Sequence, residues 1–200
     1  MRTAWGYDID LPADQPICPL VTMDDFNERT NMAYINNPRA EAAVIAASQA
    51  VRNYCGWHIS PSMRCLAHPV GGGMVLRLPA GYLSSISEIH ENGEHVQPET
   101  YEWRSDGLIR KTRHRRWTHR WDGIDVWYRA GYEPKAVPDL AEAVCAIAAG
   151  VLAVSAGVTS ESADGVSISY AQSASSIAAG LTWQQKQALE AYKVVNAHGA

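Results

Sequence analysis

The sequence predicts an α+β fold in which a small helical core carries a β-rich insertion. Apolar residues recur every three or four positions in two segments, which is the spacing of a helix with one buried face. Between these segments, prolines and glycines separate short runs rich in β-forming residues. With 200 residues, 46% of them hydrophobic, the chain is long enough to bury such a core. The helices are expected at about 38–55, 139–157 and 182–196, and the insertion at about 57–132.

The same patterns divide the chain into five segments. The first has three prolines and no periodicity, so it is expected to be an extended arm. It lacks the basic start and apolar run that are typical of a signal peptide. The segments are the N-terminal arm (1–21), N-terminal helices (22–56), the β-rich insertion (57–132), the second core helix (133–158) and a partner-binding C-terminal segment (159–200).

The N-terminal helices have start and stop signals. Thr22 followed by Asp25 predicts an N-cap and a short helix to about residue 36. Pro38 predicts a second start, because its missing N–H costs nothing in the first helical turn, and Gly56 predicts the end. The expected buried face of this second helix consists of Ala40, Val44, Ala47, Val51 and Tyr54.

In the insertion, Asn92-Gly93 lies between two β-forming runs. Both positions of such a two-residue turn need a positive φ, so the pair predicts a β-hairpin. Gly71-Gly72-Gly73 lacks the Gly-Lys-Ser/Thr of a phosphate loop and is expected to be a flexible turn. Several glutamates are expected to form a solvated face, or a partner surface for arginines, rather than an acid/base pair. These are Glu88, Glu91, Glu94, Glu99 and Glu102.

The longest apolar stretch lies at about 139–157. A membrane span of about 20 residues is the alternative there. However, Glu142 lies inside the stretch, and no basic or aromatic residues flank it. We therefore expect a buried helix whose small-residue face lets another backbone approach. Its bulky stripe is Leu140, Val144, Ile147, Val151, Val154 and Val158.

The C-terminal segment is rich in Ser, Ala and Gly but contains two patterned pieces. Val166, Ile168 and Tyr170 alternate as in an exposed strand, which can extend the sheet of a partner. Thr182 and Gln185 have the spacing of a capping box, which predicts the start of the last helix.

The stretch IRKTRHRRWTHRWDG, at 109–123, has an unusual charge. It holds six of the 17 basic residues, in a chain of net charge −4. The other 11 bases stand against 21 acids, so the remainder has a balance of −10. Because the stretch lies between expected strands at about 108–112 and 124–129, we predict that it is the tip of a hairpin.

Three interpretations of this tip are open: a solvated loop, a DNA contact, or a contact with an acidic surface of a neighbouring subunit or partner. Trp117 and Trp121 could stack on exposed DNA bases, but an isoelectric point near 5.9 argues against a dedicated nucleic-acid binder. We favour the subunit or partner contact, for which Trp and Arg are typical. The candidate residues are Arg113, Arg115, Arg116, Trp117 and Arg120.

Cysteine and histidine occur at two paired spacings in CGWHISPSMRCLAH. Cys55 with His58, and Cys65 with His68, supply four groups that can bind zinc. The pairs are Cys-His twice rather than the usual Cys-Cys and His-His, so zinc remains an alternative and no cofactor is expected. The four cysteines form no disulfide framework and predict reduced thiols in a cytoplasm-like compartment. Neither G-x-S-x-G nor H-E-x-x-H occurs, and we expect no enzyme.

Three further stretches follow one another in a recognisable order. They are AASQAVRNYCGWHISP, then IDVWYRAGYEPKAVPDLAEAVCAIAAG, then SESADGVSISYA with GLTWQQKQALEAY. The first is similar to the helix-to-strand junction of the head-to-tail adaptor (connector) proteins of long-tailed bacteriophages. The second resembles that family's strand, Gly-Tyr turn, proline-bearing loop and second major helix, and the third resembles its C-terminal run. The match covers roughly residues 38–195.

The resemblance implies a helical hairpin core with a β-rich insertion, assembled as a homo-oligomeric ring of twelve copies in the virion neck. In that family the ring sits beneath the portal protein, receives the stopper (head-completion) protein on its other face, and lets packaged DNA pass through its lumen. It further implies assembly in the host cytoplasm and no membrane partner. Residues 166–192 are expected to grip the portal, with Tyr170, Trp183, Leu189 and Tyr192 as anchors.

The arm and the basic hairpin depart from the family's plain pattern, and two alternative functions remain. One is a stopper or tail-completion protein of the same neck, although such proteins tend to be small β-barrels without two long helices. The other is a zinc-containing nucleic-acid-binding protein that uses the Cys/His set and the basic tip.

Overall fold

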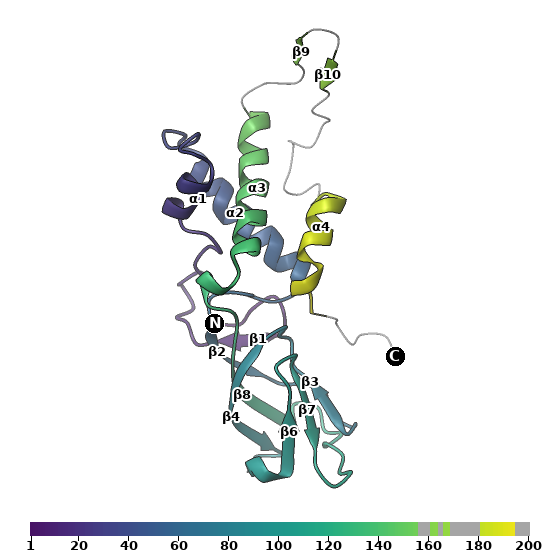
Figure 1. The fold of residues 1–200 in the computed structure, drawn as a ribbon. Coiled ribbons are helices and arrows are strands. Elements are labelled where there is room, and N and C mark those ends of the chain that lie inside the picture. Colours follow the sequence, from purple (N-terminus) through teal and green to yellow (C-terminus); the bar gives the residue numbers. More distant parts are fainter. Residues whose placement is uncertain (156–160, 164–165, 169–180, 195–200) are drawn as a thin grey trace. The chain divides into compact units, whose positions relative to one another are not determined.

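The computed structural model describes residues 1–155, 161–163, 166–168 and 181–194, and the chain forms two compact units (Figure 1). Each unit is built from segments that are far apart in the sequence. The β-rich unit comprises Met1–Cys18, Cys55–Glu133 and Tyr192–Ala200, and the helical unit comprises Pro19–Tyr54 and Pro134–Ala191. The predicted α+β class is confirmed.

The helical unit contains four α-helices, among the residues that the structure describes. The helix α3 contacts both α1 and α4. The expected helix at 182–196 is shorter than predicted, because it changes into a 3₁₀ turn at Glu190–Tyr192. The helices are α1 (Met23–Arg29), α2 (Ala40–Cys55), α3 (Pro138–Ser155) and α4 (Trp183–Leu189), with a second 3₁₀ turn at Pro134–Ala136.

The buried faces of α2 and α3 are largely those that the spacing predicts. Four of the five positions predicted for α2 are at most 2% exposed. In α3 the face begins as predicted but then follows Val144, Ala148 and Leu152, whereas Val151 is only half-buried. A strict seven-residue stripe drifts around a helix of 3.6 residues per turn, which explains the error. The side chains of Val154 and Val158 lie outside the described residues.

The predicted N-cap of α1 is confirmed, but its predicted end is wrong. The Thr22 side-chain oxygen accepts a hydrogen bond of 3.1 Å from the Asp25 backbone N–H. The helix ends at Arg29 because Asn31 and Met32 adopt positive φ angles of 49° and 61°, which a right-handed helix does not allow.

In the described part of the β-rich unit there are two antiparallel sheets, which lie side by side in Figure 1. A backbone hydrogen bond of 2.7 Å from Leu83 N–H to the Ser105 carbonyl joins them. The five-stranded sheet has the order β1 (Tyr7–Ile9), β2 (Met63–Ala67), β8 (Ile124–Ala130), β4 (Leu83–Glu91) and β5 (Glu94–His95). The three-stranded sheet has the order β3 (Val75–Arg77), β7 (Leu108–Lys111) and β6 (Tyr101–Trp103), with a 3₁₀ turn at Pro98–Thr100.

The central strand β8 buries one face and exposes the other. Its alternate residues Ile124, Val126, Tyr128 and Ala130 are at most 1% exposed, as expected for a strand with one face in the core. The hairpin between β4 and β5 is also as predicted, with φ of 55° at Asn92 and 86° at Gly93.

The N-terminal segment contains a strand that its composition does not predict. Strand β1 pairs with β2, with Asp8 opposite Leu66. The Ala130 carbonyl accepts a hydrogen bond of 3.0 Å from His58 Nε2, which leaves Nδ1 to accept one of 2.7 Å from the Tyr7 hydroxyl. Residues 7–9 are therefore part of the sheet rather than a free arm.

The described part of the C-terminal segment includes a short antiparallel pair, β9 (Glu161–Ala163) and β10 (Val166–Ile168). A strand is thus confirmed at 166–168, and Tyr170 lies outside the described residues. Among the described helices, none combines the length and apolar character that a membrane crossing requires.

Candidate interaction surfaces

Residues 112–123, here called the basic segment, connect the two sheets. Strand β7 before it belongs to the three-stranded sheet, and β8 after it belongs to the five-stranded sheet. The two strands do not pair with each other, so the predicted hairpin is wrong. The periodicity of a strand does not reveal its partner, and the segment is a crossover rather than a tip.

Trp117 fixes the middle of the basic segment to the fold. Its side chain is 1% exposed, and the Lys111 Nζ lies 4.6 Å from the centre of its ring. The Trp117 N–H donates a hydrogen bond of 2.8 Å to the Gly73 carbonyl, and the Gly72 N–H donates one of 3.2 Å to the Trp117 carbonyl. The expectation that Trp117 contacts a partner or DNA is therefore wrong, because the side chain is part of the core.

Glu91 holds the same segment from the neighbouring sheet. One carboxylate oxygen accepts a hydrogen bond of 2.7 Å from the Thr118 N–H, and the other pairs with Lys111. The side chains of Lys111 and Glu91 are only 12% and 18% exposed, so solvent screens this ion pair little.

The glycine run 71–73 is closely packed rather than a flexible turn. A Cβ on Gly71 would lie 2.1 Å from the Thr118 carbonyl oxygen, and one on Gly72 would lie 2.7 Å from the His119 ring. At Gly71 the close neighbour is backbone, so only glycine lets the two stretches approach there, whereas at Gly72 it is a side chain. The run is thus the surface against which the basic segment packs.

The remaining arginines of the segment are exposed, and one of them, Arg116, donates a hydrogen bond of 3.4 Å to the Gly72 carbonyl. Trp121 is 84% exposed. By contrast, the bases just outside the segment have acidic partners: Arg110 pairs with Glu102 at 2.7 Å, and Arg104 pairs with Asp106 at 3.0 Å. Four exposed arginines form no ion pair with any residue that the structure describes, and these are Arg113, Arg115, Arg116 and Arg120.

Three glutamates of the insertion form ion pairs within the chain. Glu91 and Glu102 pair with Lys111 and Arg110 of the same chain, which takes up part of the acidic surface expected to meet arginines. Glu88 pairs with His90 on the solvent side of β4.

The two histidines of the zinc alternative have other partners, and its two cysteines are buried. Both ring nitrogens of His58 have the partners described above, and His68 Nδ1 lies 2.7 Å from the Asp125 carboxylate. Burial raises the pKa of the Cys65 thiol to about 12, whereas zinc binds the thiolate. Cys55 is fully buried. Within residues 1–155 and the other described ranges, no three His, Cys, Asp or Glu side chains come together as a metal site requires.

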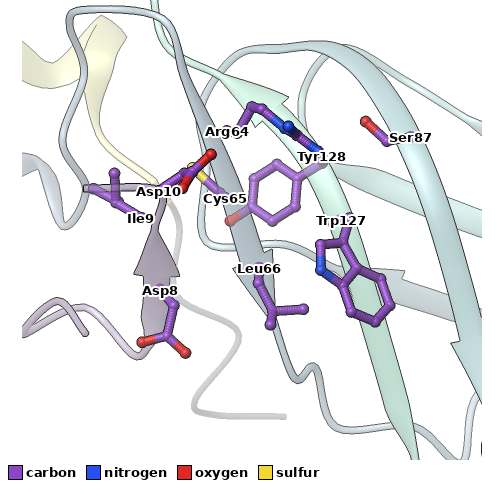
Figure 2. Close-up of a pocket in the computed structure, with 9 residues that line it drawn as sticks. All are labelled: Asp8, Ile9, Asp10, Arg64, Cys65, Leu66, Ser87, Trp127 and Tyr128. Carbon is purple, nitrogen blue, oxygen red and sulfur yellow. The ribbon is translucent and has the colours of Figure 1, made fainter. Parts of the chain in front are cut away.

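A groove lies on the solvent side of the five-stranded sheet (Figure 2). It has a volume of about 310 Å³, and Leu66 and Trp127 are cross-strand neighbours in it. No sequence motif marks this groove, although Trp127 occupies an outward position in the alternating pattern of β8. Its lining residues are Asp8, Ile9, Asp10, Arg64, Cys65, Leu66, Ser87, Trp127 and Tyr128.

The expected portal anchors differ in exposure. Trp183 is 73% exposed, whereas Leu189 and Tyr192 are 0% and 9% exposed. The Tyr192 carbonyl accepts a hydrogen bond of 2.7 Å from the Trp57 indole N–H, and its ring lies 5.8 Å from that of Tyr132. Leu189 and Tyr192 therefore stabilise the chain's own fold, which corrects their assignment as partner anchors. Trp183 remains as the exposed candidate among the described residues.

The fold is shared with proteins from the neck of phage-like particles. One is a chain in the neck of an empty GTA (gene transfer agent) particle computed with C6 symmetry, with a TM-score of 0.57 and 14% sequence identity over 97% of this chain and 98% of the other. A second is in the neck of a native GTA particle computed with C12 symmetry, with a TM-score of 0.51 and 16% identity over 84% and 94%. The resemblance to a neck adaptor is thus confirmed at the level of the fold. No family model and no curated protein matches the chain.

Proposed function

We propose that this chain is a non-enzymatic structural subunit of a phage-like neck, in which identical copies form a ring. The observation that carries the proposal is that two neck chains share the fold over nearly their whole length, 98% and 94%. A ring of twelve copies agrees with the C12 symmetry of one of those necks. In this role the ring joins the portal vertex of the head to the stopper or tail-completion proteins, and DNA passes through its lumen.

The exposed residues support a role in assembly. The chain presents Trp121 and Trp183 at 84% and 73% exposure, together with four exposed arginines that form no ion pair with a described residue, and these residue types contribute most to protein interfaces. The proposed location is the virion neck, reached by assembly in the host cytoplasm. The proposed portal-binding part is the C-terminal segment, where Trp183 is the described exposed anchor.

Imaging the particle neck tests the proposal directly. A tagged copy of the chain is expected in a ring between head and tail in electron-microscopy reconstructions of purified particles. A chain found outside the neck, or a turnover assay with a defined product, contradicts the proposal.

A deletion separates portal binding from folding. Because Leu189 and Tyr192 are buried, removing 160–200 would also destabilise the fold. Deleting only residues 161–170 is expected to leave the circular dichroism spectrum and ring formation intact and to weaken binding to purified portal, because the variant keeps Trp183. Unchanged portal binding would show that residues 161–170 do not contribute to it.

A further inference from the structure

We propose that the basic segment docks onto the acidic surface of α1 and its following turn in a second copy of this chain. The inference rests on the proposed ring and names the contact that closes it. Two surfaces of one chain carry exposed charges that form no ion pair with a described residue.

The first surface, here called the basic surface, combines unpaired charge with exposed apolar side chains. Its charges are the four arginines of the basic segment without ion pairs, and Trp121 extends from the same segment. Residues 70–75 lie beside it, because Gly71 and Gly72 contact Thr118 and His119. This stretch adds Val70, Met74 and Val75, which are 78%, 44% and 47% exposed.

The composition of the basic surface favours protein over DNA. Arginines alone suit phosphates, but exposed Val and Met side chains gain free energy only when apolar atoms cover them. Arg, Trp and Met are enriched at protein interfaces. Strand β3, which carries Val75, is also an outer strand of its sheet.

The basic surface is held in place before any partner arrives. Trp117, Lys111 and Glu91 fix its backbone through the contacts described above. Binding therefore orders side chains rather than a whole loop, which lowers its entropic cost.

The second surface, here called the acidic surface, lies in the helical unit and complements the first. Asp24, Asp25 and Glu28 are exposed on α1, and none of them forms an ion pair with a described residue. The Asp25 carboxylate accepts a hydrogen bond of 2.7 Å from the Thr22 hydroxyl and keeps its charge. The turn after α1 adds Met32 and Ile35, which are 54% and 59% exposed. Each surface thus combines exposed apolar side chains with charge, and the charge of one surface is opposite in sign to that of the other.

A contact between two different surfaces of identical chains is heterologous. Such a contact repeats from copy to copy and closes into a ring when the rotation between copies fits. One interface then covers the exposed apolar residues and pairs the charges of both surfaces.

Two charge-reversal variants test this contact in the full-length chain. The basic-reversed variant is R113E/R115E/R116E/R120E, and the acid-reversed variant is D24K/D25K/E28K. Each is expected to weaken self-association at least tenfold in sedimentation velocity at about 0.1 M salt, where exposed charges still interact over about 10 Å. Circular dichroism and thermal unfolding verify that both variants fold.

A 1:1 mixture of the variants is expected to assemble again. In an alternating ring, each reversed basic surface meets a reversed acidic surface, and each native surface meets a native one. A matched control reverses four exposed arginines elsewhere and so has the same net charge as the basic-reversed variant. It is expected to assemble like the wild type and to leave the acid-reversed variant unassembled in mixtures. Its positions are Arg2, Arg64, Arg104 and Arg129.

Four results overturn the inference. They are wild-type assembly by the basic-reversed variant, failure of the mixture to assemble, loss of DNA affinity with assembly unchanged, and a wild type that does not self-associate at low salt. None of them contradicts the proposed function if the tagged chain is still found in particle necks. A chain absent from the necks contradicts the proposed function instead.

Discussion

The basic segment and the C-terminal residues 181–194 each contain an aromatic residue that holds the fold and a tryptophan that does not. Trp117 is 1% exposed, whereas Trp121, four residues later, is 84% exposed. In the C-terminal residues, Tyr192 is 9% exposed and Trp183 is 73% exposed. In the basic segment, the buried Trp117 fixes the backbone from which Trp121 extends. In the C-terminal residues, the helix α4 that carries Trp183 also carries the fully buried Leu189.

The comparison shows that aromatic content in a polar segment serves two purposes. A large buried ring stabilises the position of the segment, and an exposed ring is then available to a partner at low conformational cost. Substituting the two kinds of residue should therefore give opposite results: loss of stability for one, and loss of binding for the other.

The largest expected difference is between Trp117→Ala and Trp121→Ala. Removing the buried ring of Trp117 should lower the free energy of unfolding by about 3–5 kcal/mol. Removing the exposed ring of Trp121 should change it by less than about 0.5 kcal/mol. Guanidinium titration followed by circular dichroism measures both values, and similar losses for the two variants would break the comparison.

Leu189→Ala and Trp183→Ala make the same test in the C-terminal residues. Leu189 is fully buried, so its truncation should cost about 2–5 kcal/mol. Trp183→Ala should leave the unfolding midpoint unchanged and weaken binding to purified portal. A stable Leu189→Ala variant with impaired portal binding would restore Leu189 as a partner anchor.

A smaller difference is expected between two acidic residues of the β-rich unit. Glu91→Gln removes the charge opposite the largely buried Lys111 and should cost about 1–3 kcal/mol. Glu102→Gln removes the charge opposite Arg110, but both side chains of that pair are more than 60% exposed, so it should cost less than about 1 kcal/mol. Equal losses in the same guanidinium titration would show that Glu91 does not fix the basic segment.

The features that were predicted correctly are those set by local spacing. The N-cap at Thr22, the apolar face of α2 and the turn at Asn92-Gly93 each depend on residues a few positions apart. Their chemistry can be read from a short window of sequence.

The features that were missed depend on contacts between distant residues. Strand β8 pairs with β2, about 60 positions earlier, so no local pattern excluded a hairpin between β7 and β8. The backbone of the buried Trp117 is hydrogen-bonded to Gly72 and Gly73, more than 40 positions earlier, and the tryptophan itself gives no sign of this. Strand β1, within the predicted arm, was missed for the same reason, since the Tyr7 hydroxyl is hydrogen-bonded to His58, 51 positions away.

The smallest expected effect concerns the start of α4, which positions Trp183. The Thr182 oxygen accepts a hydrogen bond from the Gln185 N–H, and the Gln185 side chain accepts one from the Thr182 N–H. Thr182→Ala removes the first bond and should cost about 1 kcal/mol, which lowers the melting temperature by about 2–4 °C in a chain of this size. Gln184→Ala, in the same turn but outside the capping box, is the matched control and should not shift it. Equal melting temperatures for the two variants would mean that the cap does not hold α4, and that the exposed Trp183 lacks the anchored backbone that Trp121 has.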